Sequence, residues 1–166
     1  MEAVVGAKLM QLTVNGKETQ VAVKPNETLL DVLREKLGLT GAKSACEAGD
    51  CGACTVLIDG TSMLSCLLLA IDCEGKDILT IEGMANPKTG ELHPIQEAFI
   101  ENHAVQCGFC TPGMILATKA LLDKNKSPTE EEIKEAVNGN ICRCADYVSI
   151  FEAISAAAEK IRKGRG

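Results

Sequence analysis

Hydrophobic and polar residues alternate along two neighbouring stretches near the start of the chain, Leu9 to Val14 and Thr19 to Val23. Alternation with a period of two is typical of a strand that buries one face. Between the two stretches lies Asn15-Gly16, a pair that favours the type I′ turn of a two-residue hairpin. The pattern therefore predicts an antiparallel hairpin.

A second hairpin is predicted further along, from Thr55–Ile58 through the turn Asp59-Gly60 to Met63–Leu69. Ile78 to Ile81 adds a short last strand. Between the hairpins, an apolar stripe at helical spacing predicts a helix from Thr28 to Leu37. Thr28 and Asp31 can form a capping box at its start, and Gly38 can end it. Residues 1–82 are thus expected to fold as a β-grasp, ferredoxin-like domain of α+β class.

The second half of the chain has helical rather than strand periodicity. Proline occupies first-turn positions in two of the expected helices, and Thr129 with Glu132 provides a capping box in a third. A linker containing Asn86-Pro87 separates this half from the first. We expect a four-helix domain over residues 83–166. Its helices are predicted at Pro94–Asn102, Pro112–Asp123, Thr129–Val137 and Ser149–Ile161.

Composition and charge narrow the function. The net charge of −6 argues against a nucleic-acid partner, and no apolar run approaches the roughly 20 residues of a membrane span. The start lacks the features of a secretory signal, so we expect a cytoplasmic protein. Aromatic residues make up only 2% of the chain, whereas there are nine cysteines. In a reducing compartment, clustered cysteines indicate metal or redox chemistry rather than disulfides.

The first cysteine group has the spacing C-x4-C-x2-C, formed by Cys46, Cys51 and Cys54. This is the plant-type 2Fe–2S spacing. The surrounding loop is rich in glycine and alanine, which lets the backbone turn sharply and bring N–H groups close to sulfur. A zinc site is the alternative, but zinc sites more often combine two C-x2-C elements.

The fourth ligand of this group is predicted from hairpin register. If Asp59-Gly60 is a two-residue turn, the pairing places Cys66 opposite Ala53 and therefore beside Cys54. Cys73 lies seven residues further on, roughly 23 Å away along an extended chain. Cys66 is therefore the expected ligand, and Cys73 is expected to be a small buried side chain or a spare thiol.

The second group consists of Cys107 and Cys110, spaced C-x2-C, and Cys142 and Cys144, spaced C-x-C. Each pair precedes an expected helix, whose free N–H groups and dipole favour an anionic cluster. Zinc remains an alternative here too, although C-x-C is an awkward spacing for tetrahedral zinc. Two centres in so short a chain must lie close together, which favours electron relay over a structural metal role.

The sequences GAKSACEAGDCGACTV, QCGFCTPGM and NGNICRC together resemble the small iron–sulfur subunit of the molybdenum hydroxylases, the xanthine dehydrogenase, aldehyde oxidoreductase and carbon monoxide dehydrogenase relatives. The resemblance covers roughly residues 8–160. It implies two 2Fe–2S clusters, with electrons passing from molybdopterin on a large subunit to FAD on a medium subunit. It also implies that Gln106 and Cys144 face the pterin. The expected assembly is a dimer of heterotrimers.

The chain departs from the family pattern at two places. Ala45-Cys46-Glu47 replaces the usual GCG, and Ala145-Asp146 follows Cys144 where the family commonly has Thr-Gly. Glu47 and Asp146 each add a negative charge beside a cluster, and each is expected to lower that cluster's potential. No catalytic constellation, substrate site or G-x-G-x-x-G fingerprint is evident. The alternatives to a relay subunit are a free two-cluster ferredoxin and a zinc-stapled interaction module.

Overall fold

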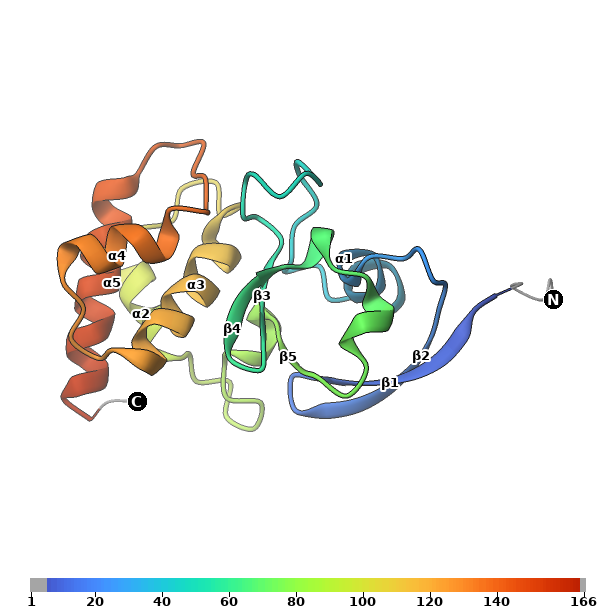
Figure 1. Ribbon diagram of the computed structural model, residues 1–166. Helices are drawn as coiled ribbons and strands as arrows, with labels where there is room; N and C mark the ends of the chain where they lie inside the picture. Colours follow the sequence, from blue (N-terminus) through green and yellow to red (C-terminus); the bar gives the residue numbers. More distant parts are fainter. Residues whose placement is uncertain (1–5, 165–166) are drawn as a thin grey trace.

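A computed structural model describes residues 6–164 of the chain, which has an α+β fold (Figure 1). Its five-stranded mixed sheet has the strand order β2-β1-β5-β3-β4, with β1 and β5 parallel and the other neighbours antiparallel. The strands are β1 (Lys8–Val14), β2 (Lys17–Val23), β3 (Thr55–Ile58), β4 (Thr61–Leu64) and β5 (Asp77–Leu79).

Both predicted hairpins are present, with two-residue turns. Asn15 and Gly16 have φ values of 52° and 71°, and Asp59 and Gly60 have φ values of 49° and 76°. These positive φ values at both central positions are those that a type I′ turn requires. The second hairpin is shorter than expected. The chain leaves β4 after Leu64 and forms the 3-10 helices η2 (Ser65–Leu67) and η3 (Ala70–Cys73).

The helix of the first half begins at the predicted capping box. The Thr28 hydroxyl accepts the N–H of Asp31, and the Asp31 carboxylate accepts the N–H of Thr28. The helix starts as α1 (Leu29–Asp31) and continues as the π-helical turn η1 (Val32–Lys36), where the Leu37 N–H bonds to the carbonyl of Val32. The sequence predicts the helix but not its wider last turn.

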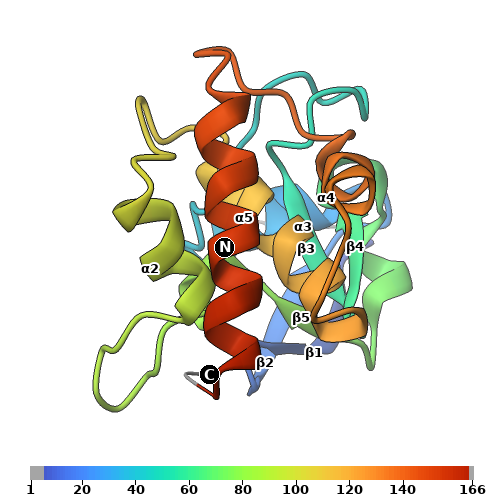
Figure 2. The same ribbon diagram turned by 90° about the vertical axis from the view of Figure 1, so that its left-hand side faces the viewer.

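Four α-helices follow β5 and the short 3-10 helix η4 (Ile81–Gly83). Helix α5 runs alongside α2, as Figure 2 shows. Helix α3 packs on β3, between the sheet and the other helices (Figure 1). The helices are α2 (Pro94–Glu101), α3 (Thr111–Lys124), α4 (Glu130–Val137) and α5 (Tyr147–Arg162).

Strand β3 lies between two hydrophobic cores. Val56 is fully buried in the core formed by the sheet and α1, whereas the next residue, Leu57, is buried in the core of the helical half. This follows from the alternation of side chains along a strand, which sends neighbours to opposite faces. The helices are therefore packed against the sheet mainly on β3, and α3 also contacts β4 and η4.

Candidate metal centres

Three of the segments that carry cysteines lie on one side of the molecule. Figures 1 and 2 both show the loop before β3, the loop before α3 and the loop before α5 at the top of the view. The first loop contains Cys46, Cys51 and Cys54, the second Cys107 and Cys110, and the third Cys142 and Cys144. All nine cysteines are free thiols.

Cys46 is surrounded by donors from its own loop. The Ala48 N–H points at its sulfur, with nitrogen and sulfur 3.4 Å apart. This N–H, followed by the Cys51 thiol and the N–H groups of Cys51 and Asp50, lowers the pKa of Cys46 to about 6. Backbone donors aimed at a thiolate are what a cluster-binding loop needs, since hydrogen bonds to sulfur tune the bound centre.

Cys66 lies beside Cys54 at the end of the second hairpin. The register Thr55↔Leu64 extends one step beyond the strands, where the Ser65 N–H bonds to the Cys54 carbonyl at 3.3 Å. Burial, then a hydrogen bond and charge interaction with the Cys54 thiol, raises the pKa of Cys66 to about 11. These interactions place the thiols of Cys54 and Cys66 together.

Cys73 has different surroundings. It is buried in the core of the first half, and its sulfur lies 3.7 Å from the carbonyl oxygen of Leu69. Burial raises the pKa of Cys73 most. The negative charge of Asp72 raises it further, and the positive charge of Lys76 lowers it. The groups that interact with the Cys73 thiol are thus the Leu69 carbonyl and the side chains of Asp72 and Lys76, and none of them is a cysteine.

The second group forms two pairs as well. Burial and then the Cys142 thiol raise the pKa of Cys110 to about 12. The Phe109 N–H and then the Cys144 thiol lower the pKa of Cys107. Cys110 occupies the N-cap position of α3, and Cys142 and Cys144 precede α5. Helix starts present unpaired N–H groups, which favour thiolates and anionic clusters.

The thiols of each group are therefore arranged two by two. Within residues 6–164, no three His, Cys, Asp or Glu side chains converge on one point in the manner of a mononuclear metal site. A 2Fe–2S cluster has two irons, each held by two cysteine thiolates. Tetrahedral zinc needs its four ligands around one ion. The paired thiols therefore fit a binuclear cluster in each group.

The family models agree with this arrangement. A 2Fe-2S iron-sulfur cluster binding domain matches residues 12–77, and a second 2Fe-2S binding domain matches residues 80–155. The small FeS subunit of nicotinate dehydrogenase from Eubacterium barkeri is 47% identical over 151 residues, which cover 91% of this chain and 95% of that protein. The chain belongs to the small iron–sulfur subunits of the molybdenum hydroxylases.

Two further relatives show how far the similarity extends. The xanthine dehydrogenase iron-sulfur-binding subunit of Escherichia coli O157:H7 is 47% identical over 147 residues, covering 87% of this chain and 91% of that one. In the crystal structure of quinoline 2-oxidoreductase from Pseudomonas putida 86, one chain superimposes with a TM-score of 0.90 at 44% identity. It covers 96% of this chain and 99% of that chain. No helix within residues 6–164 combines the length and the apolar character of a membrane span.

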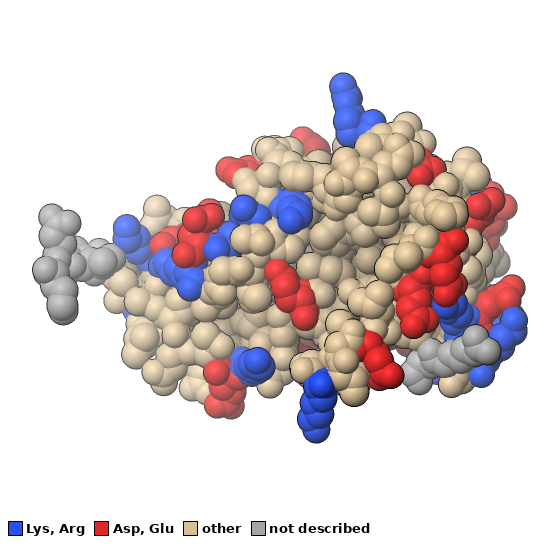
Figure 3. Space-filling view, turned by 180° about the vertical axis from the view of Figure 1, so that it is seen from behind, with Lys and Arg blue, Asp and Glu red and all other residues tan. Residues whose placement is uncertain are grey.

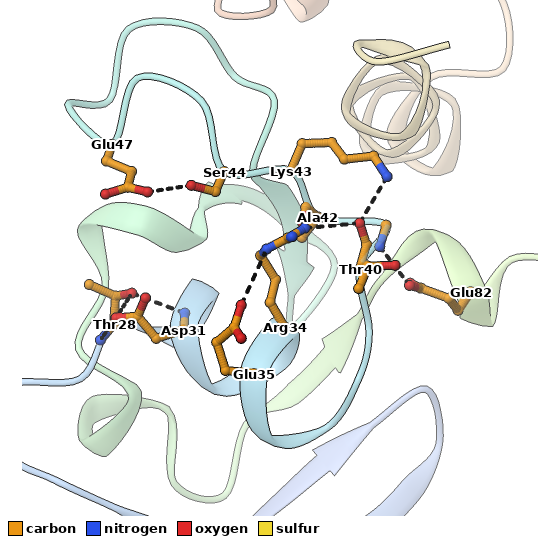
Figure 4. A network of polar contacts seen from close by, with 11 residues as sticks. Thr28, Asp31, Arg34, Glu35, Thr40, Ala42, Lys43, Ser44, Glu47 and Glu82 are labelled. Atoms are coloured by element: carbon orange, nitrogen blue, oxygen red, sulfur yellow. Dashed lines mark hydrogen bonds and ion pairs between the residues drawn. The ribbon is translucent and has the colours of Figure 1, made fainter.

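Glu47, the departure at the first cluster loop of this iron–sulfur subunit, has a strained backbone. Its φ is 52°, a left-handed conformation that glycine adopts at little cost and other residues rarely adopt. Its carboxylate is held by the Ser44 hydroxyl across the loop (Figure 4). The carboxylate of Glu47, the residue after Cys46, is therefore directed across the loop toward Ser44.

The segment leading into this loop is anchored to the rest of the first half. The Arg34 guanidinium donates to the carbonyls of Thr40 and Ala42 at 3.2 and 2.8 Å, and the Gly41 N–H bonds to the Glu82 carboxylate at 2.7 Å (Figure 4). These contacts fix the point from which the loop departs. Sequence patterns gave no sign of them, because the partners come from η1 and from beyond β5.

Two residues near the second group have contacts that the sequence did not predict. The Tyr147 hydroxyl accepts the N–H of Cys142 at 3.0 Å, so this tyrosine orients the backbone of a predicted ligand. Asp146 interacts with the side chains of Ser149 and then Gln106, which lower its pKa. Gln106, predicted to face the pterin, is thus exposed next to Asp146.

Proposed function

We propose that this chain relays electrons through two 2Fe–2S clusters within a molybdenum hydroxylase complex. When bound, each cluster takes up and releases one electron. The first would be held by Cys46, Cys51, Cys54 and Cys66. The second would be held by Cys107, Cys110, Cys142 and Cys144. The observation that carries the proposal is the arrangement of these eight thiols in four interacting pairs, two in each group.

We further propose a direction for the relay. Gln106 and Cys144 would face molybdopterin on a large partner subunit, because Gln106 is exposed and Cys144 is partly exposed beside the second group. The first group would face FAD on a medium partner subunit. The complex would be a cytoplasmic dimer of heterotrimers. Within this chain, residues 1–82 would form the β-grasp domain and residues 83–166 the four-helix domain.

The substrate would be selected by the molybdenum subunit rather than by this chain. Relatives of similar identity are named for nicotinate, nicotine, xanthine and aldehyde enzymes, so subunits of this type serve different substrates.

No charged face suited to nucleic acid is visible in Figure 3, where acidic and basic side chains are interspersed around broad uncharged areas.

Metal analysis and EPR of the purified native protein test the cluster assignment. Two distinct 2Fe–2S signals are expected on reduction, together with four irons per chain, the content of two binuclear clusters. Stoichiometric zinc in place of iron would favour the interaction-module alternative.

Mass spectrometry of the native assembly tests the relay assignment separately. Molybdenum-binding and flavin-binding chains are expected to co-purify with this one. A chain that carries both clusters but runs alone would instead be a free two-cluster ferredoxin.

A further inference from the structure

The two cysteine groups are joined by a buried contact that involves none of the cysteine side chains. The carbonyl of Gly52, between Cys51 and Cys54, accepts the Asn140 side-chain amide at 2.9 Å. It also accepts the N–H of Thr55 at 3.1 Å and the Thr55 hydroxyl at 2.6 Å. One carbonyl of the first loop is therefore the meeting point of donors from both halves of the chain.

The orientation of the Asn140 amide follows from its partners. A carbonyl can only accept, so the nitrogen of the amide must face Gly52. The same nitrogen lies 3.2 Å from the Thr55 hydroxyl oxygen, which can accept because its proton is directed at Gly52. Asn140 is 6% exposed and Thr55 is 1% exposed, so water competes little for these bonds.

A second bond beside this contact connects the ligand segments directly. The Ile141 N–H donates to the Cys51 carbonyl at 2.9 Å. Cys51 is a proposed ligand of the first cluster, and Ile141 immediately precedes Cys142, a proposed ligand of the second. The backbones of Cys51 and Cys142 are thus connected through one hydrogen bond and the covalent bonds of Ile141.

Two glycines make room for this contact. A Cβ on Gly52, whose φ is 67°, would lie 2.2 Å from the Gly139 carbonyl oxygen. A Cβ on Gly113, in the first turn of α3, would lie 2.6 Å from the Gly52 oxygen and 2.9 Å from the Asn140 nitrogen. All three distances are shorter than real Cβ contacts, so the close approach of the loops depends on glycine at these positions.

We propose that Asn140 is a positioning residue for electron transfer within this subunit. Its bond to the Gly52 carbonyl keeps the Ile141 N–H on the Cys51 carbonyl. Asn140 thereby sets the distance between the first and the second group of cysteines. With both clusters bound, one electron would pass from the centre held by Cys107, Cys110, Cys142 and Cys144 to the centre held by Cys46, Cys51, Cys54 and Cys66. The inference rests on the proposed relay function.

The test compares three variants in the purified native complex. Asn140→Asp keeps the shape of the side chain but removes the donor. Gly113→Ala places a methyl group against the Gly52 carbonyl. Gly139→Ala is the matched control, because a Cβ there meets nothing within 4 Å. Hydrogen exchange at the Ile141 amide and the dipolar splitting between the two reduced clusters in EPR are measured for each.

Asn140→Asp and Gly113→Ala are each expected to speed hydrogen exchange at the Ile141 amide several-fold. Each should also change the dipolar splitting between the two reduced clusters. Gly139→Ala should match the parent in both measurements. Exchange and splitting that stay at parental values in both variants would overturn the inference while leaving the relay itself intact. Absence of one or both cluster signals from the parent protein would instead overturn the proposed function.

Hydrogen exchange in the parent protein tests the contact between the loops even if a variant loses its iron. Ile141 is expected to exchange much more slowly than exposed Arg143, two residues away, because its N–H is bonded across the loops. Equal exchange rates at the two amides would show that no lasting contact exists, and the inference would fail.

Discussion

At the scale of single residues, the choice between Cys66 and Cys73 depends on where the second hairpin ends. Cys66 stands one residue beyond the Ser65–Cys54 backbone bond, whereas Cys73 bonds to the Leu69 carbonyl inside the core. We predict that Cys66→Ser loses the EPR signal of the first cluster and that Cys73→Ser keeps both signals. The reverse pattern would exchange the roles of the two cysteines.

Glu47 offers a second test at this scale. Glu47 follows Cys46 directly in the chain, its carboxylate accepts the Ser44 hydroxyl, and reduction of the first cluster would add an electron near that negative charge. We predict that Glu47→Gln raises the reduction potential of the first cluster, since glutamine removes the charge and keeps the size. The effect should weaken with added salt because Glu47 is exposed.

The second cluster is the internal control for Glu47→Gln, and its potential should stay at the parental value. Asp146→Asn is the corresponding change at the second cluster and should raise that potential alone. A potential of the first cluster that does not move in Glu47→Gln would contradict the electrostatic explanation.

At the scale of elements, helix α2 begins at an unusual cap. The Nδ1 atom of His93 accepts the Ile95 N–H at 3.2 Å, and the Gln96 side chain accepts the His93 N–H at 3.0 Å. Nδ1 can accept only when it is unprotonated. Burial, followed by the charge of Lys119, lowers the pKa of His93 in the folded chain. Both observations favour the neutral ring.

A pH dependence of stability follows. Because the folded pKa is lowered, the unfolded chain binds this proton more readily. The contribution of His93 is therefore present above its unfolded pKa of about 6.5 and is lost as the pH falls through that value. We predict that His93→Asn, which can still cap the helix, flattens the decline in unfolding free energy from about pH 7 to pH 5. Denaturant titrations across that range measure it, and identical slopes in both proteins would contradict the prediction.

The elements that the sequence predicts well are those determined by neighbouring residues. Both hairpin turns and the capping boxes at Thr28 and Thr129 depend on residues within four positions of each other. The contacts that it did not predict join distant segments. Asn140 and Gly52 are 88 residues apart, and nothing in either local pattern marks them as partners. The hairpin register predicted that Cys66 lies beside Cys54, whereas the pairs Cys107–Cys144 and Cys110–Cys142 join distant segments and required the fold.

At the scale of the whole molecule, Leu57 connects the two cores. It is 2% exposed, comes from the sheet, and packs among the helices. We predict that Leu57→Ala lowers the unfolding free energy by about 2–5 kcal/mol, the usual cost of such a truncation in a core. Because the residue belongs to both halves, unfolding should remain a single transition that shifts as a whole.

Leu9→Ala is the matched control, since Leu9 is 64% exposed and lies in β1 of the same sheet. Its unfolding free energy should change by no more than about 0.5 kcal/mol. Two separate transitions in calorimetry, with only one moved by Leu57→Ala, would show that the halves unfold independently.

The hydrogen bond from Ile141 to Cys51 also joins two segments that are synthesised at different times. Protein synthesis runs from the N-terminus, so the loop of Cys46, Cys51 and Cys54 leaves the ribosome long before Asn140 and Ile141 do. Until those two residues arrive, the Cys51 carbonyl lacks its bond from Ile141, and the Gly52 carbonyl has only its bonds from Thr55. The contact between the two cysteine loops can therefore form only after the segment with Asn140 and Ile141 has been synthesised.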